Sequence, residues 1–179
     1  WIAVVNWNGA ALLPACLTAL RAQSHPAHVV VVDNGSTDDS AAVAARFPEV
    51  EWLPLGENTG FAEANNVVFR RALAAGADFV GTVNTDVQVD PAWLGAILQA
   101  ADQNPRAGIF GGLLLFADKP DVVNSTGIVV DWIGRARDRD FGVPEKTLTT
   151  EDGPVTGISG GAALFRTDTL RRVGLFDPR

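Results

Sequence analysis

The sequence contains one cysteine, Cys16, and no methionine among its 179 residues. A single cysteine cannot form an internal disulfide, which indicates a reducing compartment and a cytoplasmic protein. No apolar run reaches the ~18 residues that a membrane-spanning helix requires, so we expect no membrane span. Because the chain lacks methionine, opens inside an apolar segment and stops three residues after Phe176, we expect a piece of a longer protein, incomplete at both ends.

Basic residues are also few. The chain has 14 Lys and Arg against 21 Asp and Glu, a net charge of −7, and its pI is about 4.7. This balance argues against nucleic acid as a partner, and we expect none. Arg135, Arg137 and Arg139 alternate with Asp138 and Asp140, and we interpret this polar stretch as a solvated, mobile loop.

Several common site motifs are missing. No G-x-G-x-x-G follows the first strand and no G-x-x-x-x-G-K-[ST] occurs, which argues against a dinucleotide oxidoreductase and a P-loop enzyme. His25 and His28 have no cysteine pair or acidic cluster beside them, so a zinc site is not indicated. Cys16 falls on the apolar face of an expected helix and is interpreted as core, not as a nucleophile.

What is present is a regular alternation of strands and helices in residues 1–105. Strands are expected over residues 2–5, 28–33 and 51–55, and from 79 to about 84; helices are expected over 10–22, 36–47, 58–75 and 91–103. Ser36 opens the second helix with capping-box spacing, and Pro91 stands at the first position of the fourth. Four consecutive valines before Asp33 indicate a strand buried on both faces. The pattern predicts an α/β domain with a mostly parallel sheet and helices on both faces.

The pattern changes after residue 105. Residues 107–116 and 122–130 are strand-like, residues 131–154 have no clear period and are expected to form a long loop, and residues 167–173 form a short helix. Between them, Gly157, Gly160 and Gly161 interrupt an apolar run, which suits either close backbone approach to a bound group or a β-bulge.

Two carboxylates follow buried strands, where open α/β sheets bind ligands. Asp86 could hold a divalent cation that grips a diphosphate, although a lone aspartate after a strand more often caps a turn. Asp33 could accept hydrogen bonds from a nucleoside, or it could satisfy amides of the next helix. Asn58, Gly60 and Asn65 stand at a helix start where backbone can approach a ligand, and the alternative is an ordinary polar helix face.

Five sequence motifs follow one another along the chain and can be compared with those of known families. They are Val4-Val5-Asn6-Trp7-Asn8-Gly9, Val31-Val32-Asp33-Asn34-Gly35-Ser36-Thr37-Asp38, Asn58-Thr59-Gly60-Phe61-Ala62, Asn84-Thr85-Asp86, and Gly160-Gly161 through Gly174-Leu175-Phe176-Asp177. Together they resemble the family 2 glycosyltransferases of GT-A fold, in particular the rhamnosyltransferase-like branch. The resemblance covers nearly the whole chain. It implies inverting transfer of a sugar, with rhamnose as the leading candidate, from a dTDP- or UDP-sugar to a glycan or lipid-linked acceptor, with Mg²⁺ or Mn²⁺.

The resemblance also implies roles for individual residues. The positions expected at the nucleotide and donor are Asn6, Asp33, Asn34, Asn58, Gly60, Asn65, Asn84, Asp86, Gly160 and Gly161. Asp86 would be the metal ligand of a D-x-D-like motif whose first position is Asn84 here. Residues 1–105 would be the nucleotide-binding half and residues 106–179 the acceptor-side half. The general base is expected beyond Arg179, and Asp177 is not assigned that role.

Two other functions remain open at this point. A sugar nucleotidyltransferase would need basic residues in the loop after the first strand, and Asn6-Trp7-Asn8-Gly9 has none. A non-catalytic module that binds a nucleotide or glycan would need the same fold without the base. A lipid-linked acceptor would bring the protein to the inner face of the membrane.

Overall fold

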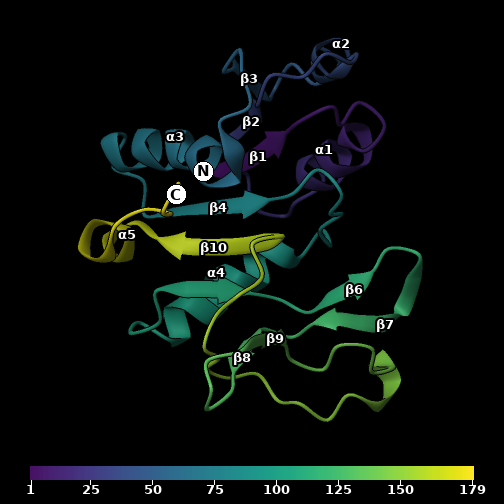
Figure 1. Ribbon diagram of the computed structural model, residues 1–179, viewed down its shortest axis with the longest axis vertical. Coiled ribbons are helices and arrows are strands. Elements are labelled where there is room, and N and C mark those ends of the chain that lie inside the picture. Colours follow the sequence, from purple (N-terminus) through teal and green to yellow (C-terminus); the bar gives the residue numbers. More distant parts are fainter.

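The computed structural model describes residues 1–179 and is built around a six-stranded sheet of order β3-β2-β1-β4-β10-β5 (Figure 1). The strands of this sheet are β1 (Ile2–Asn6), β2 (Val29–Asp33), β3 (Glu51–Pro54), β4 (Phe79–Val83), β5 (Ile109–Gly111) and β10 (Ala162–Arg166). Strands β1 to β4 pair in parallel, whereas β10 is antiparallel to both β4 and β5. The expected mostly parallel α/β fold is confirmed.

Helices cover both faces of the sheet. They are α1 (Leu13–Arg21), α2 (Ser40–Ala44), α3 (Gly60–Ala74), α4 (Trp93–Gln103) and α5 (Thr167–Val173). One core cluster joins α1, α2 and α4 to side chains such as Val4 and Val31, and a second joins α3 and α5 to Ala3, Val30 and Val32. Because successive strand residues point to opposite faces, this division explains why the valine strand has no polar position before Asp33.

The second region of the chain is built from short strands. Strands β6 (Leu114–Phe116) and β7 (Lys119–Ser125) form one two-stranded sheet, and β8 (Ile128–Val130) and β9 (Ala136–Asp138) form another, followed by the 3₁₀ turn η1 (Glu145–Thr147). In Figure 1 these elements lie below the six-stranded sheet. No helix is long and apolar enough to cross a bilayer.

Several local expectations are wrong. Residues 107–116 do not form one strand, because β5 joins the main sheet and β6 leaves it. Residues 122–130 likewise divide between β7 and β8, and residues 131–154 contain β9 and η1. The arginine-rich stretch is therefore part of an ordered hairpin, with Arg139 half-buried and bonded to the carbonyl oxygen of Thr126.

Two helix starts also differ from expectation. Helix α2 has only five residues and begins at Ser40, so Ser36 caps nothing. Pro91 precedes the N-cap residue Ala92 of α4 instead of occupying its first turn, and Asp90 accepts the backbone N–H of Ala92 at 2.8 Å. In both places a polar turn takes up the residues that the sequence pattern assigns to a helix.

Candidate functional site

The carboxyl ends of β1 and β2 lie side by side because the two strands pair in register, Asn6 opposite Asp33. Both side chains are buried, and Nδ2 of Asn6 donates to Oδ1 of Asp33 at 3.3 Å. Strand β4 pairs with the other side of β1, so the chain order reverses between β1 and β4. Such switch points are where open α/β sheets bind ligands, beyond the carboxyl ends of the strands.

Asn6 and Asp33 retain acceptor capacity at this edge. Oδ1 of Asn6 is buried without any hydrogen-bond partner. Asp33 accepts only the amide of Asn6 and the backbone N–H of Ser36, at 3.3–3.4 Å, so neither carboxylate oxygen has a short partner. Buried polar atoms are normally paired, and these acceptors therefore suit a ligand that brings N–H or O–H donors.

The loops after β1 and β2 are fastened to each other by the side chains of Ser36, Asn8 and Asp38, of which Ser36 was predicted to cap a helix. Oγ of Ser36 accepts the backbone N–H of Asn8 at 2.9 Å and the amide of Asn6 at 3.0 Å. Oδ1 of Asn8 accepts the backbone N–H of Thr37 at 2.8 Å, and Asn8 adopts a left-handed conformation with φ of 52°. Carboxylate Oδ2 of Asp38 accepts the N–H of Ala10 at 2.9 Å. The positive φ suits an asparagine at Asn8, which was the one available sequence signal.

Hydrogen bonds with Ser40 and Ala10 lower the pKa of Asp38, the Ser40 side chain contributing most. Asp38 is therefore ionised at neutral pH and holds the loop as an acceptor. The exposed side chain of Trp7 stands on this fastened loop. Together these contacts give the edge above β1 and β2 a fixed backbone.

Asn34 joins the end of β2 to the start of α3. Its Nδ2 donates to Oδ1 of Asn58 at 3.0 Å, and its Oδ1 accepts the backbone N–H of Thr59 at 2.8 Å. Asn58 in turn accepts the N–H of Gly60, whose φ is +81°. The structure thus brings Asn34, Asn58 and Gly60 to the same edge, where the side chains of Asn34 and Asn58 hold the helix start in place.

Asn65 lies deeper than the other predicted residues. It is buried inside α3, its Nδ2 donates to the carbonyl oxygen of Phe61 at 2.9 Å, and its Oδ1 has no partner. Its neighbour Asn66, which the sequence did not single out, makes two hydrogen bonds of 2.8 and 3.0 Å with the backbone of Phe176. Asn66 therefore fixes the segment after α5 against α3.

The turn after β4 meets the glycines that precede β10. The backbone N–H of Asn84 donates to the carbonyl oxygen of Gly161 at 2.9 Å, and Oγ1 of Thr82 donates to that of Gly160 at 3.0 Å. Gly160 faces the ring of Phe61, which a Cβ on this glycine would contact at 3.5 Å. Gly160 and Gly161 are thus placed between the start of α3 and the turn that carries Asp86.

Asp86 is exposed in this turn, and its carboxylate makes no hydrogen bond within the protein. Burial, and secondly the negative charge of Asp86, raise the pKa of the Cys16 thiol to about 12. Cys16 is buried, as expected for a core residue. No group of three or more His, Cys, Asp or Glu side chains is placed to hold a metal by itself. A lone free carboxylate still fits Mg²⁺ or Mn²⁺, because such ions commonly take one or two carboxylates and complete their shell with substrate phosphates and water.

A cavity at the other end of the sheet and the side chain of Asp177 do not contribute to this site. The cavity of about 230 Å³ at the opposite end of the sheet is lined mostly by apolar residues such as Leu94 and Leu98, with His28 and Asp78 as its titratable side chains. Asp177 is exposed, and its bonds with Arg179 lower its pKa, which makes it a weaker proton acceptor. The described geometry gives Asp177 no feature of a general base.

Comparison with known proteins gives one consistent result. The sequence model of "Glycosyl transferase family 2" matches residues 1–174. Two curated relatives from Mycobacterium tuberculosis strains, each an N-acetylglucosaminyl-diphospho-decaprenol L-rhamnosyltransferase, are 31% identical over 179 aligned residues, covering 88% of this chain. The chain spans 58% of the length of these relatives.

Solved structures share the fold at lower identity. TarS from S. aureus in complex with UDP-GlcNAc aligns with a TM-score of 0.70 and 18% identity, over 98% of this chain and 47% of that one. A mannosyltransferase from Pyrobaculum calidifontis in complex with GDP-Man and Mn²⁺ aligns with a TM-score of 0.67 and 20% identity, over 99% and 47%. At these identities the likeness concerns the fold.

Proposed function

The chain belongs to glycosyl transferase family 2, and we propose that the carboxyl edge of its sheet binds the nucleoside diphosphate sugar of an inverting transfer. The acceptor would be a hydroxyl of a glycan or of a lipid-linked sugar. One observation carries the proposal: Asn6, Asp33 and the Asp86 turn meet at the switch point between β1 and β4. Ligands of open α/β sheets bind at this position.

The nucleoside would lie against Asn6 and Asp33. Both present acceptors, namely the unpartnered Oδ1 of Asn6 and the loosely bonded carboxylate of Asp33. Uracil and thymine each carry an N–H donor and the ribose carries hydroxyl donors, so a UDP- or dTDP-sugar complements this pair. Asn34, Asn58 and Gly60 would support the same pocket by holding the start of α3 beside it.

The diphosphate would lie towards Asp86. A Mg²⁺ or Mn²⁺ ion bound there would act as a Lewis acid that stabilises the charge on the leaving nucleoside diphosphate. Asp86 suits this position because its carboxylate is exposed and unpaired. Asn84 stands at the first position of the motif. Its backbone N–H donates to the carbonyl oxygen of Gly161, and its own carbonyl oxygen accepts the thiol of Cys16, so the side chain of Asn84 remains available to the donor.

For the sugar and acceptor, we propose rhamnose from a dTDP donor and an N-acetylglucosaminyl diphosphate lipid, by analogy with the named relatives. Gly160 and Gly161 would border the sugar, and Asn65 would act from inside α3. Residues 1–105 would hold the nucleotide and residues 106–179 the acceptor, which would bring the protein to the inner face of the membrane. A nucleotidyltransferase is disfavoured, because the loop after β1 carries no cation.

Calorimetry with dTDP-rhamnose, UDP-GlcNAc and GDP-mannose in the presence of Mn²⁺ tests the proposal. We expect dTDP-rhamnose to bind most tightly, and Asp33→Ala to weaken its binding while the fold stays intact. Asp39→Ala is the matched control, because Asp39 is exposed on the same connection and its side chain makes no capping bond. Absence of binding by all three donors, or equal loss in both variants, would overturn the assignment.

A further inference from the structure

The Asp86 turn, residues 84–87, is held from two sides. The backbone N–H of Val87 donates to the carbonyl oxygen of Asn84 at 3.0 Å and closes the turn. On one side, the backbone N–H of Asn84 donates to the carbonyl oxygen of Gly161 at 2.9 Å, which ties the turn to the segment that leads into β10. On the other side, the turn contacts helix α1 through a side chain that the proposed reaction does not use.

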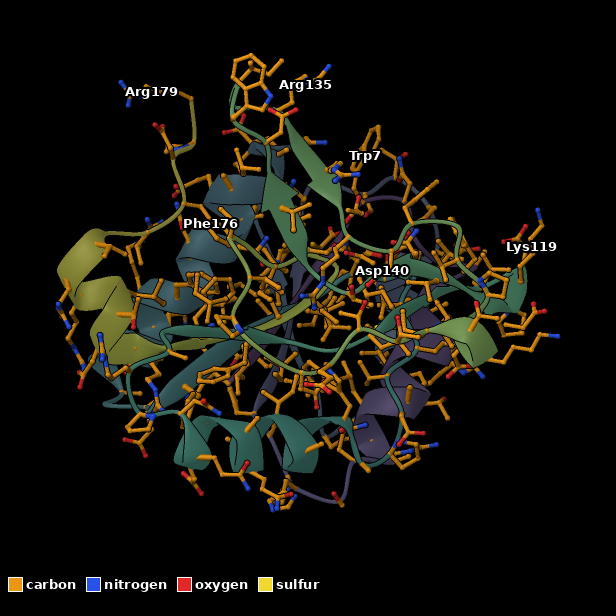
Figure 2. The ribbon with its side chains drawn as sticks, turned by 90° about the horizontal axis from the view of Figure 1, so that it is seen from below. Trp7, Lys119, Arg135, Asp140, Phe176 and Arg179 are labelled. Atoms are coloured by element: carbon orange, nitrogen blue, oxygen red, sulfur yellow. The ribbon has the colours of Figure 1, made fainter.

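That side chain is Cys16, which is fully buried on the face of α1 that packs against the sheet. Figure 2 shows α1 in purple and α4 in teal on this one face. Sγ of Cys16 donates to the carbonyl oxygen of Asn84 at 3.5 Å. A carbonyl oxygen has two lone pairs, so it can accept this thiol and the N–H of Val87 together. The other buried side chains of α1 are leucines, so Cys16 is the one buried side chain of this helix that can donate a hydrogen bond.

Helix α1 is itself fixed to the loop that a nucleoside would contact. The backbone N–H groups of Leu12 and Leu13 both donate to the carbonyl oxygen of Gly9 at 2.9 Å. Gly9 ends the loop that begins at Asn6, and this loop is fastened to the connection after β2. The start of α1 is therefore joined to the nucleoside side of the sheet edge, and Cys16, in the first turn of the helix, contacts the Asp86 turn.

We propose that Cys16 is a positioning residue of this site: its thiol holds Asn84, and with it the Asp86 carboxylate, where a divalent cation and the diphosphate would bind. The inference rests on the proposed function, because it takes Asp86 as the cation ligand. Binding groups need to be held within about 0.5 Å of their productive position. The exposed carboxylate of Asp86 makes no hydrogen bond within the protein, so only the backbone of its turn can hold it there.

A side chain that merely filled space would not need the thiol proton, and this difference can be measured. Amide hydrogen exchange followed by NMR tests the positioning without any ligand. Cys16→Ala should raise the exchange rate of the Val87 amide about fivefold, because the carbonyl oxygen that this amide contacts is held less well and the turn opens more often. Cys16→Ser keeps a donor at this position and should restore most of the protection.

Val29→Ala is the matched control for loss of buried volume. Val29 is buried in the same apolar cluster as Cys16, but it starts β2 and so lies at the opposite end of the strands from the Asp86 turn. This variant should leave exchange of the Val87 amide at the wild-type rate. Equal exchange at Val87 in Cys16→Ala and wild type, or an equal increase in Val29→Ala, would overturn the proposal.

Calorimetry of UMP and UDP, with and without Mn²⁺, tests the consequence for binding. Cys16→Ala should reduce the gain in UDP affinity that Mn²⁺ provides about fivefold, with UMP binding unchanged, and Cys16→Ser should recover most of this gain. Val29→Ala should bind like the wild type, and an equal loss of the gain in Val29→Ala and Cys16→Ala would contradict the inference. Absence of any Mn²⁺-dependent gain in the wild type would instead count against the proposed function, and the exchange rates would still decide whether Cys16 holds the turn.

Discussion

The two regions of the chain are built differently. Residues 1–105 place four parallel strands in one sheet, each followed by a helix or turn that returns across a face. Residues 106–179 divide their strands among three sheets, and only β5 and β10 join the large one. The first region therefore carries most of its candidate site residues at or just after the ends of its strands, with Asn58, Gly60 and Asn65 at or inside α3. The second region brings residues to the same edge through β10, which runs antiparallel beside β4.

This difference concerns energetics as well as topology. The two apolar clusters draw most of their buried side chains from the strands and helices of the first region, with β5, β10 and α5 completing them. The segment from β6 to η1 has Val123 as its one buried apolar side chain. We infer that the first region, with β10, sets the stability of the molecule, and that the segment 112–161 adds little to it.

The largest expected effect tests this inference. Phe69 is fully buried in α3 and packs against Phe165 and Phe176, with ring centroids 5.4 and 5.2 Å away. Phe69→Ala should lower the free energy of unfolding by about 3–5 kcal/mol, because it leaves a cavity. Phe141→Ala, an exposed phenylalanine between β9 and η1, should cost less than about 1 kcal/mol. Urea titration measures both, and similar losses would remove the energetic contrast.

A smaller loss of stability is expected when a glycine of the first region, Gly9, is replaced by alanine, and none when Gly153 of the second region is replaced. A Cβ on Gly9 would stand 2.4 Å from Oδ1 of Asn6, so Gly9→Ala must displace the Asn6 side chain. We expect a loss of about 1–3 kcal/mol, as is usual for overpacking, together with weaker nucleotide binding. Gly153→Ala meets no atom within 4 Å and should be neutral for both. The contrast fails if Gly9→Ala is as well tolerated as Gly153→Ala.

The smallest expected effect is the pH dependence of stability that comes from the buried thiol of Cys16. Burial and the charge of Asp86 raise the pKa of Cys16 from 9.0 to about 12. A raised folded-state pKa means that the neutral thiol is favoured, so its contribution to stability is complete below pH 9 and is lost as the pH rises towards 12. At pH 8, Cys16 should react with a disulfide reagent only after unfolding. Rapid reaction in the native state would show that this side of the sheet edge is open.

The same contrast explains how much the sequence could predict. In the first region the valine strand, the turn after Asp33 and the Asn84-Thr85-Asp86 turn were located correctly, because strand ends and turn residues are adjacent in the chain. The start of α2 was placed wrongly because Ser36 has capping-box spacing, yet its hydroxyl accepts the N–H of Asn8 and the amide of Asn6, 28 and 30 residues away. Local patterns do not reveal such long-range partners.

In the second region prediction was weaker for the same physical reason. Nothing local in residues 107–116 shows that β5 pairs with β10 while β6 pairs with β7, since both segments are apolar. The sequence did not predict strand β9, because this strand is short, polar and exposed. It is held in place by its pairing with β8, which no local pattern reveals. Likewise, the contact of Asn66 with Phe176 spans 110 residues and has no local sequence signal.

We propose that the nucleoside and the diphosphate are held at different strand ends, by Asp33 at the end of β2 and by Asp86 in the turn after β4. Calorimetry of UMP and UDP, with and without Mn²⁺, against wild type, Asp33→Ala and Asp86→Ala tests it most directly. Asp33→Ala should weaken both nucleotides about ten- to a hundredfold, the value of one charged hydrogen bond of roughly 1.5–3 kcal/mol. Asp86→Ala should remove only the Mn²⁺-dependent part of UDP binding. Unchanged metal-dependent binding in Asp86→Ala, or a loss confined to UDP in Asp33→Ala, would contradict the account.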